Sequence, residues 1–244
     1  MSTSDQPICL ITGASRGIGL SVSEYLLSRG YVVYGVSRSI TPDAQSLIEK
    51  YSSTFFFFAA DVTRHDTFKP ILRNIWSSHK QLNLLVHCAG VAHGGLLSLV
   101  DFADFQYVFD VNYFSPLFIS KLASRYLSRS SRSQVIFISS SSAYRFDPGT
   151  LAYASSKAAI NYATKQLSFE FSSMGIRVNC IAPGVTNTSM LAEMSSIAIE
   201  NQLTSSSLRK ICEPQQIAAM VYFLTTSEAS HVNGQVFRID GGMP

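Results

Sequence analysis

The residues Thr12-Gly13-Ala14-Ser15-Arg16-Gly17-Ile18-Gly19 follow an apolar run at 8–11 and lead into a segment of helical period at 18–28. Glycines at a turn from strand to helix let backbone N–H groups approach a pyrophosphate, and the amino end of the helix supplies a positive field there. The spacing is Gly-x-x-x-Gly-x-Gly rather than the Gly-x-Gly-x-x-Gly of many dinucleotide-binding folds. The turn predicts a dinucleotide site that includes Gly13, Ser15, Arg16, Gly17, Ile18 and Gly19.

Beyond this turn, short β-rich apolar runs alternate with longer segments of helical period. The runs lie at 8–11, 31–36, 55–59, 82–87, 135–139, 176–181 and 235–239. This alternation predicts an α/β fold, a doubly wound (Rossmann) three-layer sandwich with a seven-stranded, mostly parallel sheet. Because both sides of a central parallel strand are buried, the four phenylalanines at 55–58 indicate a buried strand rather than an alternating edge strand.

The length of 244 residues and a composition of 46% hydrophobic and 14% charged residues indicate one folded domain over 1–244. The net charge of +3 comes from 19 basic and 16 acidic residues without a run of like charges, which argues against nucleic-acid or membrane binding. No apolar run reaches the ~18 residues of a membrane span, and residues 1–7 hold no Lys or Arg. We therefore expect a cytoplasmic protein.

The four cysteines, Cys9, Cys88, Cys180 and Cys212, are far apart in the sequence. The first three lie in apolar, strand-like contexts, which favours reduced core residues over a disulfide or a zinc site. We expect no metal site.

Ser37 and Arg38 follow the second apolar run, where NAD-binding enzymes of this fold place an acidic residue on the ribose hydroxyls. A carboxylate would repel a 2′-phosphate, whereas a guanidinium binds one with charge-assisted hydrogen bonds. Together with Arg16 in the glycine turn, these residues predict NADP(H) rather than NAD(H). The alternative is that both arginines are solvated surface charges.

Tyr153 and Lys157 stand four positions apart where a helix is expected to start after the fifth run. Residues i and i+4 share one helix face, so the ammonium of Lys157 is expected beside the phenol of Tyr153. A nearby positive charge lowers the pKa of a phenol, which would make Tyr153 a competent proton donor or acceptor. Ser140 stands at the carboxyl end of the fifth run, the edge where open α/β sheets place their sites.

The whole chain resembles the short-chain dehydrogenase/reductase family, because a set of its motifs occurs in the family's order and approximate spacing. The set comprises residues 12–19, Asp61-Val62, Asn112, Ser140, Tyr153, Lys157, Pro183-Gly184 with Thr188, and the tail from Gly234-Gln235 to Asp240-Gly241-Gly242-Met243. The resemblance implies an NADP-dependent oxidoreductase that acts on a CH–OH or C=O group.

The resemblance also implies a role for each matching residue. Tyr153 would be the general acid toward a substrate carbonyl, and Ser140 would hold the carbonyl oxygen, with Ser139 and Ser141 as alternatives. Lys157 would lower the pKa of Tyr153 and bind the nicotinamide ribose. Asn112 would hold a water that feeds the proton relay, unless it only caps or bends its helix. Cofactor contacts are implied for Asp61 and Val62 at the adenine, for Ala89, Gly90, Tyr153, Pro183 and Gly184, and for Val185, Thr186 and Thr188 at the carboxamide.

His87 and Cys88 depart from the family, which usually has two asparagines before Ala89-Gly90. Those asparagines help to order the sheet and the adenosine side of the pocket, so an imidazole and a thiol put the local hydrogen bonds in doubt. No second ligand lies at a useful spacing from His87. We expect a satisfied core or cofactor-lining histidine.

Residues 188–212 are expected to form a substrate lid. Apolar residues recur there at roughly helical spacing, which fits either a substrate-facing surface or ordinary helix packing: Met190, Leu191, Met194, Ile197, Ile199 and Leu203. The length of the chain and of this segment most resemble the bacterial 3-oxoacyl-acyl-carrier-protein reductases. Met174 replaces an arginine of those enzymes, which leaves Arg129, Arg132 and Arg177 as alternatives for docking an acidic carrier or as plain surface charges.

Three functions remain open. The first is NADPH-dependent reduction of a 3-oxoacyl thioester, on acyl carrier protein or CoA, in fatty-acid or polyketide-type metabolism. The second is the same chemistry on a free small carbonyl compound or secondary alcohol, and the third is an NADP-binding scaffold or sensor that has lost catalysis. The family mostly forms homotetramers through two long helices, here 112–129 and 153–173. Phe118, Leu122, Phe169 and Phe171 are either contacts of such an interface or residues that face the sheet.

Overall fold

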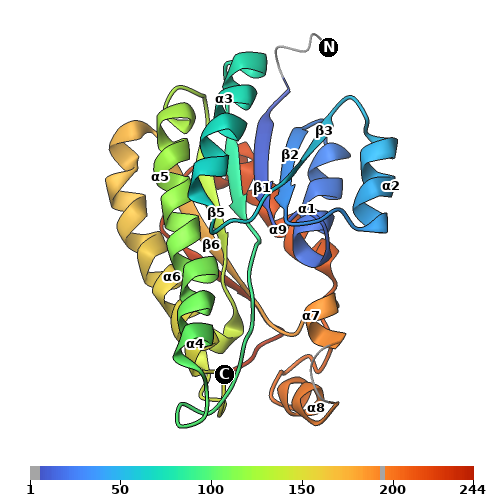
Figure 1. The fold of residues 1–244 in the computed structure, drawn as a ribbon, viewed down its shortest axis with the longest axis vertical. Coiled ribbons are helices and arrows are strands. Elements are labelled where there is room, and N and C mark those ends of the chain that lie inside the picture. The colour runs from blue at the N-terminus through green and yellow to red at the C-terminus, as the bar shows by residue number, and fades with distance from the viewer. Residues whose placement is uncertain (1–5, 193–195) are drawn as a thin grey trace.

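The computed structural model of the chain describes residues 6–192 and 196–244. These residues form a seven-stranded sheet in the order β3-β2-β1-β4-β5-β6-β7, with each neighbouring pair parallel (Figure 1). The strands are β1 (Ile8–Thr12), β2 (Val32–Ser37), β3 (Phe55–Ala59), β4 (Leu84–His87), β5 (Gln134–Ile138), β6 (Arg177–Pro183) and β7 (Val236–Ile239). The predicted doubly wound α/β fold is confirmed.

Helices cover both faces of this sheet (Figure 1). One face carries α1 (Gly17–Leu27), α2 (Pro42–Lys50) and α9 (Pro214–Thr225), and the other carries α3 (Phe68–His79), α5 (Ser115–Leu127) and α6 (Leu151–Glu170), with α4 (Phe102–Phe109) packed against α6. The helices α7 (Ser189–Ala192) and α8 (Ser196–Thr204) lie toward the lower end of Figure 1, near the C-terminus. In the described part of the chain, no helix has the length and apolar character that crossing a membrane requires.

Short helical turns complete the chain. Turns of 3-10 helix lie at His65–Thr67, Ser141–Tyr144, Ser172–Met174 and Ser227–Ala229, and a π-helical turn lies at Asp110–Phe114. The turn Ser141–Tyr144 follows β5, and the π-helical turn leads directly into α5. Both therefore lie where the carboxyl ends of the central strands open toward a site.

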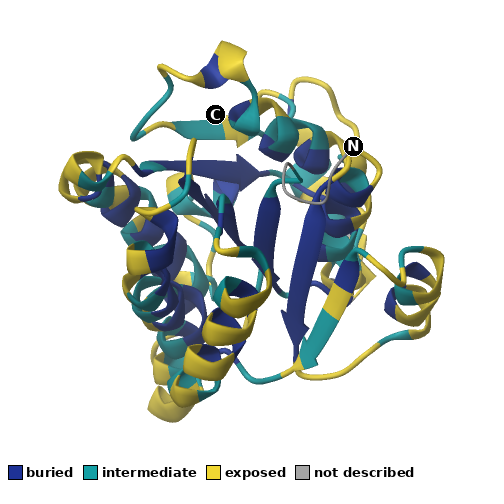
Figure 2. Ribbon diagram, turned by 90° about the horizontal axis from the view of Figure 1, so that it is seen from above, coloured by how far each residue is buried: buried dark blue, intermediate teal, exposed yellow. Residues whose placement is uncertain are grey.

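The core lies in two layers, one on each side of the sheet. Successive side chains of a strand point to opposite faces, so Ile8 and Leu10 of β1 join one layer while Cys9 and Ile11 join the other. Figure 2 shows the central strands buried and the outer helix faces exposed. Cys9 and Cys180 are buried strand residues, as expected for core cysteines, whereas Cys88 and Cys212 are partly buried.

Strand β3 lies at an outer edge of the sheet, so the expectation of a strand buried on both faces is wrong. Phe55 is buried, but Phe56 is 37% exposed. The aromatic run has a different physical basis, because the ring of Tyr34 in β2 stacks on Phe56 and Phe58, with centres 5.0 and 6.1 Å apart. Such cross-strand aromatic pairs stabilise a two-strand edge.

Candidate active site

The glycine turn after β1 forms a cradle of bare backbone at the amino end of α1. Gly13 has φ +73°, and a Cβ placed on it would lie 2.6 Å from the backbone nitrogen of Ala89. A Cβ on Gly19 would overlap the carbonyl oxygen of Gly13, and one on Gly17 would lie 3.1 Å from Cγ2 of Thr188. The chain therefore comes this close to itself only where residues lack a Cβ.

Ser15 fixes the turn against the neighbouring strand and helix. Its N–H donates to Oγ of Ser37 at 3.1 Å, and its carbonyl accepts from Oγ1 of Thr41 at 2.5 Å. Thr41 also caps α2 by accepting from the N–H of Ala44 at 3.2 Å. The sequence reading missed Thr41, although Thr-Pro-Asp at 41–43 is a typical helix start that could have revealed it.

Arg16 and Arg38 both lie exposed at this cradle. Arg16 is the extended N-cap residue of α1, and in the described structure its side chain does not cap the helix. Arg38 follows β2 and donates from Nη1 to the hydroxyl of Tyr107 at 3.3 Å. The positive end of α1 and the two guanidinium groups suit an anion such as a phosphate. No local signal in the sequence indicates Tyr107, which is 69 residues from Arg38.

Asp61 and Val62 follow β3 and lie beside the end of β2, where the N–H of Ala60 donates to the carbonyl of Ser37 at 2.9 Å. Oδ1 of Asp61 accepts from the N–H and the hydroxyl of Thr63, at 2.9 and 2.8 Å. Asp61 therefore shapes the turn through one carboxylate oxygen. Val62 is buried in the core layer on the α3 side.

His87 ends β4 as a buried side chain. Its Nε2 shares a 2.9 Å hydrogen bond with Oγ of Ser120, and its ring stacks on Phe137 with centres 5.1 Å apart. Nδ1 has no hydrogen-bond partner among the residues that the structure describes. Burial lowers the pKa of His87 to about 3. The structure thus has a neutral core histidine, satisfied at one nitrogen only.

Cys88 and Ala89 lie directly under the glycine turn. A Cβ on Gly19 would be 3.2 Å from Cβ of Cys88, and the N–H of Ala89 donates to Oγ1 of Thr12 at 3.4 Å. Burial raises the pKa of the Cys88 thiol to about 12, with Lys157 acting in the opposite direction. In the described ranges, no group of three or more His, Cys, Asp or Glu side chains is placed to hold a metal ion.

Ser140, Tyr153 and Lys157 meet at the carboxyl end of β5. Ser140 caps the 3-10 turn, because its Oγ accepts from the N–H of Ser142 at 3.1 Å. Helix α6 carries Tyr153 in its first turn and Lys157 one turn later. The hydroxyl of Ser140 acts on the phenol of Tyr153 as a hydrogen-bonding neighbour that lowers its pKa. These are the three residues that the sequence singled out for proton transfer.

The neighbouring serines have other contacts. Oγ of Ser139 donates to the carbonyl of Lys157 at 3.1 Å, so Ser139 ties β5 to α6. Ser141 is buried in the turn. Of these three serines, Ser140 is the one whose hydroxyl lowers the pKa of Tyr153.

Lys157 is buried, and its Nζ donates to the carbonyl of Ile138 at 2.8 Å. The same nitrogen lies 5.7 Å from the centre of the Tyr153 ring, and a Cβ on Gly90 would be 3.5 Å from it. Burial lowers the pKa of Lys157 to about 8, while the thiols of Cys180 and Cys88 act to raise it.

The predicted lowering of the pKa of Tyr153 is wrong for this arrangement. Burial raises the pKa of the phenol, and the hydrogen bond to Ser140 only partly offsets this. The physical reason is that Lys157 is bonded to the strand carbonyl of Ile138 and is itself desolvated. A phenol with a raised pKa keeps its proton at neutral pH.

Asn112 lies in the π-helical turn with its side chain buried. Oδ1 accepts from the N–H of Val91 at 2.9 Å, and Nδ2 donates to the carbonyl of Val91 at 2.9 Å and to Oγ of Ser156 at 3.1 Å. The amide therefore fastens the chain after β4 to α6. π-Helical turns of this kind occur often at functional sites. Ser156 was missed, and the sequence holds no signal for its bond to Asn112.

Residues 183–188 lead from β6 back toward the glycine turn. Pro183 ends β6, and a Cβ on Gly184 would lie 2.8 Å from Cα of Asp240. Val185 and Thr186 are buried, and Thr188 reaches Gly17 through its methyl group. The structure thus brings this segment to the cradle, as the sequence motif implies.

Other expected residues lie away from the cradle. Arg177 donates to the carbonyls of Leu224, Ala229 and Val232 at 2.7 to 3.1 Å. The expectation that it is a free surface charge is therefore wrong, because these carbonyls occupy its guanidinium. Arg129 lies over the ring of Trp76, 5.8 Å from its centre, and Arg132 is exposed.

Met190, Leu191, Ile199 and Leu203 of segment 188–212 belong to neither core layer, whereas Cys212 at its end packs against the layer on the α1 side. Met190 is exposed, and Leu191, Ile199 and Leu203 are half-buried. Met194 lies outside the described residues, and the side chain of Ile197 is likewise not described.

A family model described as enoyl-(acyl carrier protein) reductase matches residues 13–244. With the glycine cradle and the meeting of Ser140, Tyr153 and Lys157, this match shows that the chain belongs to the short-chain dehydrogenase/reductase family. It is an NAD(P)-dependent oxidoreductase that acts on CH–OH and C=O groups.

Individual relatives match over nearly the whole chain. It is 30% identical to the 3-oxoacyl-(acyl-carrier-protein) reductase FabG of Chlamydia muridarum over 96% of both chains, and 29% identical to FabG of Thermotoga maritima over 97% of both. A short-chain type dehydrogenase/reductase from Mycobacterium ulcerans superposes with a TM-score of 0.90 at 26% identity, over 99% of this chain and 90% of that one. The structure titled ElxO with NADP bound gives a TM-score of 0.87 at 27% identity, over 97% and 98%.

Proposed function

We propose that the protein reduces 3-oxoacyl thioesters with NADPH, on acyl carrier protein or CoA, in fatty-acid or polyketide-type metabolism. The observation that carries the proposal is the meeting of Ser140, Tyr153 and Lys157 beside a glycine cradle. Its choice of substrate rests on similarity at about 30% identity to the FabG proteins, whose names state this activity.

The residues at the cradle fit a dinucleotide phosphate. The bare backbone at Gly13 and Gly19 and the amino end of α1 would bind the pyrophosphate. Arg16 and Arg38 are exposed beside it and would bind the 2′-phosphate, in line with the NADP bound by ElxO. Asp61 and Val62 would contact the adenine, and Val185, Thr186 and Thr188 would hold the carboxamide.

In the reducing direction, Tyr153 would donate its phenolic proton to the substrate oxygen while Ser140 hydrogen-bonds the same oxygen. The raised pKa of Tyr153 suits this role, because the phenol is protonated at neutral pH. Two O–H donors at one oxygen stabilise the alkoxide charge as it develops. Lys157 would bind the ribose hydroxyls. When bound, the reduced cofactor supplies the hydride for the carbonyl carbon.

Asn112 contributes by position. Both N–H donors of its amide and one acceptor position of Oδ1 are engaged with Val91 and Ser156, so it would keep the chain after β4 at a fixed distance from α6. This assignment replaces side-chain binding of a water as the part we propose for Asn112.

Segment 188–212 would serve as the substrate lid of one domain that spans 1–244. Its base is closed, because the N–H of Asn187 donates to the carbonyl of Cys212 at 2.9 Å and the N–H of Cys212 donates to that of Val185 at 2.8 Å. The helices α7 and α8 lie between these two points. A flap with a closed base can move without disturbing β6.

A homotetramer through α5 and α6 is the assembly we propose. Phe169 is 82% exposed on α6 and suits such a contact, whereas Phe171 is buried in the core, as the alternative of a sheet-facing residue has it. Phe118 stacks on His65 with ring centres 4.2 Å apart, and Leu122 is partly buried. Arg129 and Arg132 would bind the acidic surface of a carrier protein.

Cytoplasmic localisation stays a prediction.

One observation favours the second candidate, reduction of a free small carbonyl compound or oxidation of a secondary alcohol. The resemblance to the FabG-type enzymes implies an arginine at the position of Met174, and the guanidinium of the nearby Arg177 is bonded to three carbonyls. The case for docking a carrier protein is therefore weaker, whereas the residues that would reduce the carbonyl group are unaffected. The third candidate, a scaffold or sensor without catalysis, is opposed by the intact Ser140, Tyr153 and Lys157 arrangement.

The test is a substrate screen that follows NADPH oxidation with acetoacetyl-acyl carrier protein, acetoacetyl-CoA and simple ketones. Turnover of the thioesters well above that of the ketones supports the proposal. Turnover of ketones alone favours the second candidate. Tight NADPH binding without turnover of any compound would establish the scaffold.

A further inference from the structure

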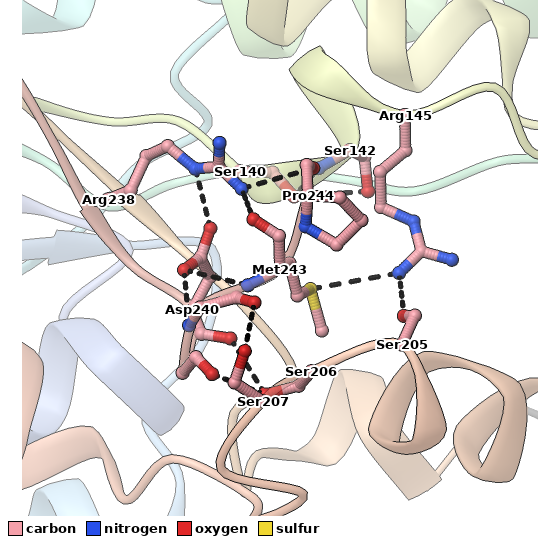
Figure 3. Close-up of polar contacts among 12 residues, drawn as sticks. Ser140, Ser142, Arg145, Ser205, Ser206, Ser207, Arg238, Asp240, Met243 and Pro244 are labelled. Atoms are coloured by element: carbon pink, nitrogen blue, oxygen red, sulfur yellow. Dashed lines mark hydrogen bonds and ion pairs between the residues drawn. The ribbon is translucent and has the colours of Figure 1, made fainter.

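Arg145 lies at one end of a polar network that joins three segments of the chain, where it contacts Ser205 and the sulfur of Met243 (Figure 3). Its side chain is 15% exposed and follows the turn that Ser140 caps. Nε and Nη2 bind the two carboxylate oxygens of Asp147 at 3.0 and 3.2 Å. Nη1 donates to Oγ of Ser205 at 2.6 Å and contacts the sulfur of Met243 at 3.7 Å.

Ser205 begins the turn that follows α8, and the next residues of that turn are attached to the carboxyl-terminal tail. Oγ of Ser206 donates to the carbonyl of Gly241 at 2.8 Å, and Oγ of Ser207 donates to that of Gly242 at 3.0 Å. A Cβ on Gly241 would lie 2.6 Å from Oγ of Ser206. The tail and the end of the lid are therefore in direct contact.

Asp240 joins this tail to the start of the same segment. Its Oδ1 accepts from the N–H of Gly242 at 3.0 Å, and Nε of Arg238 binds Oδ2 at 2.6 Å. Cα of Asp240 packs against Gly184, which precedes the lid, and its carbonyl accepts from Oγ of Ser206 at 3.2 Å. Asp240 thus contacts both the segment that leads into the lid and the turn that ends α8.

We propose that Arg145 is a positioning residue that fixes the carboxyl end of the lid to the loop that carries Ser140. The bidentate ion pair with Asp147 orients the planar guanidinium and leaves Nη1 directed at Ser205. The link holds α8 at a set distance from the proton-donating hydroxyls, where the acyl part of the substrate must lie. The inference rests on the proposed function, because it assigns Arg145 a part in holding that substrate.

The link predicts a selective kinetic effect. Removing the hydrogen bond between Arg145 and Ser205 loosens α8 over the acyl group of the substrate. It leaves the glycine turn at the amino end of α1 unchanged. The KM for the acyl thioester should rise, whereas the KM for NADPH should stay near that of the parent. A side chain needed only for folding would change both, or would lower the amount of folded enzyme.

The experiment compares Ser205→Ala, which removes one hydroxyl, with Arg145→Gln and with the double variant. The controls are Ser205→Thr, which keeps the hydroxyl, and the exposed Ser46→Ala on α2 and Arg73→Gln on α3. Each is assayed with acetoacetyl-CoA and NADPH. Each is also treated with trypsin, which cuts after the exposed Arg209 and Lys210 at the end of the lid.

We expect Ser205→Ala and Arg145→Gln to raise the KM for acetoacetyl-CoA about five- to tenfold, the size of a lost side-chain hydrogen bond. Cleavage after Arg209 and Lys210 should accelerate by a similar factor. The double variant should behave like Arg145→Gln alone, because both changes break one link. The Ser205→Thr variant should match the parent.

Parent-like KM and cleavage in Ser205→Ala and Arg145→Gln overturn the inference, as does an equal rise in the KM for NADPH. If Arg145→Gln does not fold, Ser205→Ala decides alone. If the parent turns over no acyl thioester, the proposed function fails, and the trypsin rates still show whether Arg145 holds the lid.

Discussion

Nζ of Lys157 donates a 2.8 Å hydrogen bond to the carbonyl oxygen of Ile138, the last residue of β5. This bond draws a buried cation to the end of the strand that precedes Ser140 rather than to the phenol oxygen of Tyr153. The lysine has its pKa lowered by burial, and the tyrosine has its pKa raised by burial. As the pH rises, Lys157 therefore loses its proton before Tyr153 does, and solution experiments can detect this order.

Raising the pH from neutral to about 9.5 should weaken NADPH binding. The pKa of Lys157 is about 8, so its ammonium loses its proton within this range. A ligand that prefers the charged lysine binds more tightly below that pKa than above it, and we expect a loss of about five- to tenfold. Fluorescence titration at several pH values measures this. An affinity that does not change across the range would contradict a contact between Lys157 and the ribose.

Replacing Tyr153 by phenylalanine should lower kcat about 100-fold or more, because the substrate oxygen loses its proton donor. NADPH binding should change by less than about twofold, since the phenol hydroxyl is not part of the cradle. Turnover and cofactor titration on the same preparation separate the two effects. The matched control is Tyr162→Phe, an exposed residue further along α6. Parent-like turnover in Tyr153→Phe would rule out the catalytic assignment.

Exchanging Arg38 for glutamine should raise the KM for NADPH about tenfold and leave the KM for NADH unchanged. The guanidinium forms charge-assisted hydrogen bonds with a 2′-phosphate, which NADH lacks. Arg16→Gln should act in the same direction, and Arg73→Gln on α3 should have no effect. Steady-state kinetics with both cofactors provides the comparison. A parent enzyme that prefers NADH would refute the assignment.

Exchanging His87 for asparagine should remove part of the protein's sensitivity to acid. The folded state holds the pKa of His87 near 3, while the unfolded chain binds a proton below the ordinary value of about 6.5. The unfolded state therefore takes up more protons, and stability falls as the pH drops from about 6.5 toward 3, by up to ~1.4 kcal/mol per pH unit.

Urea unfolding of the parent and of His87→Asn, measured from pH 7 to about 4, tests this difference in slope. His231→Asn, at an exposed histidine, is the control and should follow the parent. Identical slopes for His87→Asn and the parent would show that the imidazole is protonated in the folded state.

The sequence predicted the strands to within one or two residues because parallel strands buried on both sides read as continuous apolar runs. The run at 135–139 corresponds to Gln134–Ile138, for example, and 31–36 corresponds to Val32–Ser37. The placement of Phe55–Ala59 failed for a related reason. The apolar character of a strand shows that it packs, but its neighbours in the sheet depend on the path of the whole chain.

The site was predictable where its residues share one helix or one turn, as Tyr153 and Lys157 do. Contacts between distant segments were not, and the bonds of Arg38 to Tyr107 and of Arg145 to Ser205 span 69 and 60 residues. The pKa of Tyr153 belongs to the same class. It depends on how deeply α6 buries the phenol, and the spacing of Tyr153 and Lys157 in the sequence does not reveal that burial.

The glycines of the first turn differ in how a mutation at each could be repaired. At Gly13 and Gly19 the obstacles to a side chain include backbone atoms, of Ala89 and of Gly13 itself, which no second substitution can trim. At Gly17 the obstacles are the methyl group and the Cβ of Thr188, at 3.1 and 3.3 Å; a serine would remove the methyl group and leave the Cβ contact and the cost of a left-handed backbone. During evolution, a substitution at Gly17 can therefore be eased by a second substitution at residue 188. No second substitution can do this for Gly13 or Gly19, because backbone atoms block a side chain there.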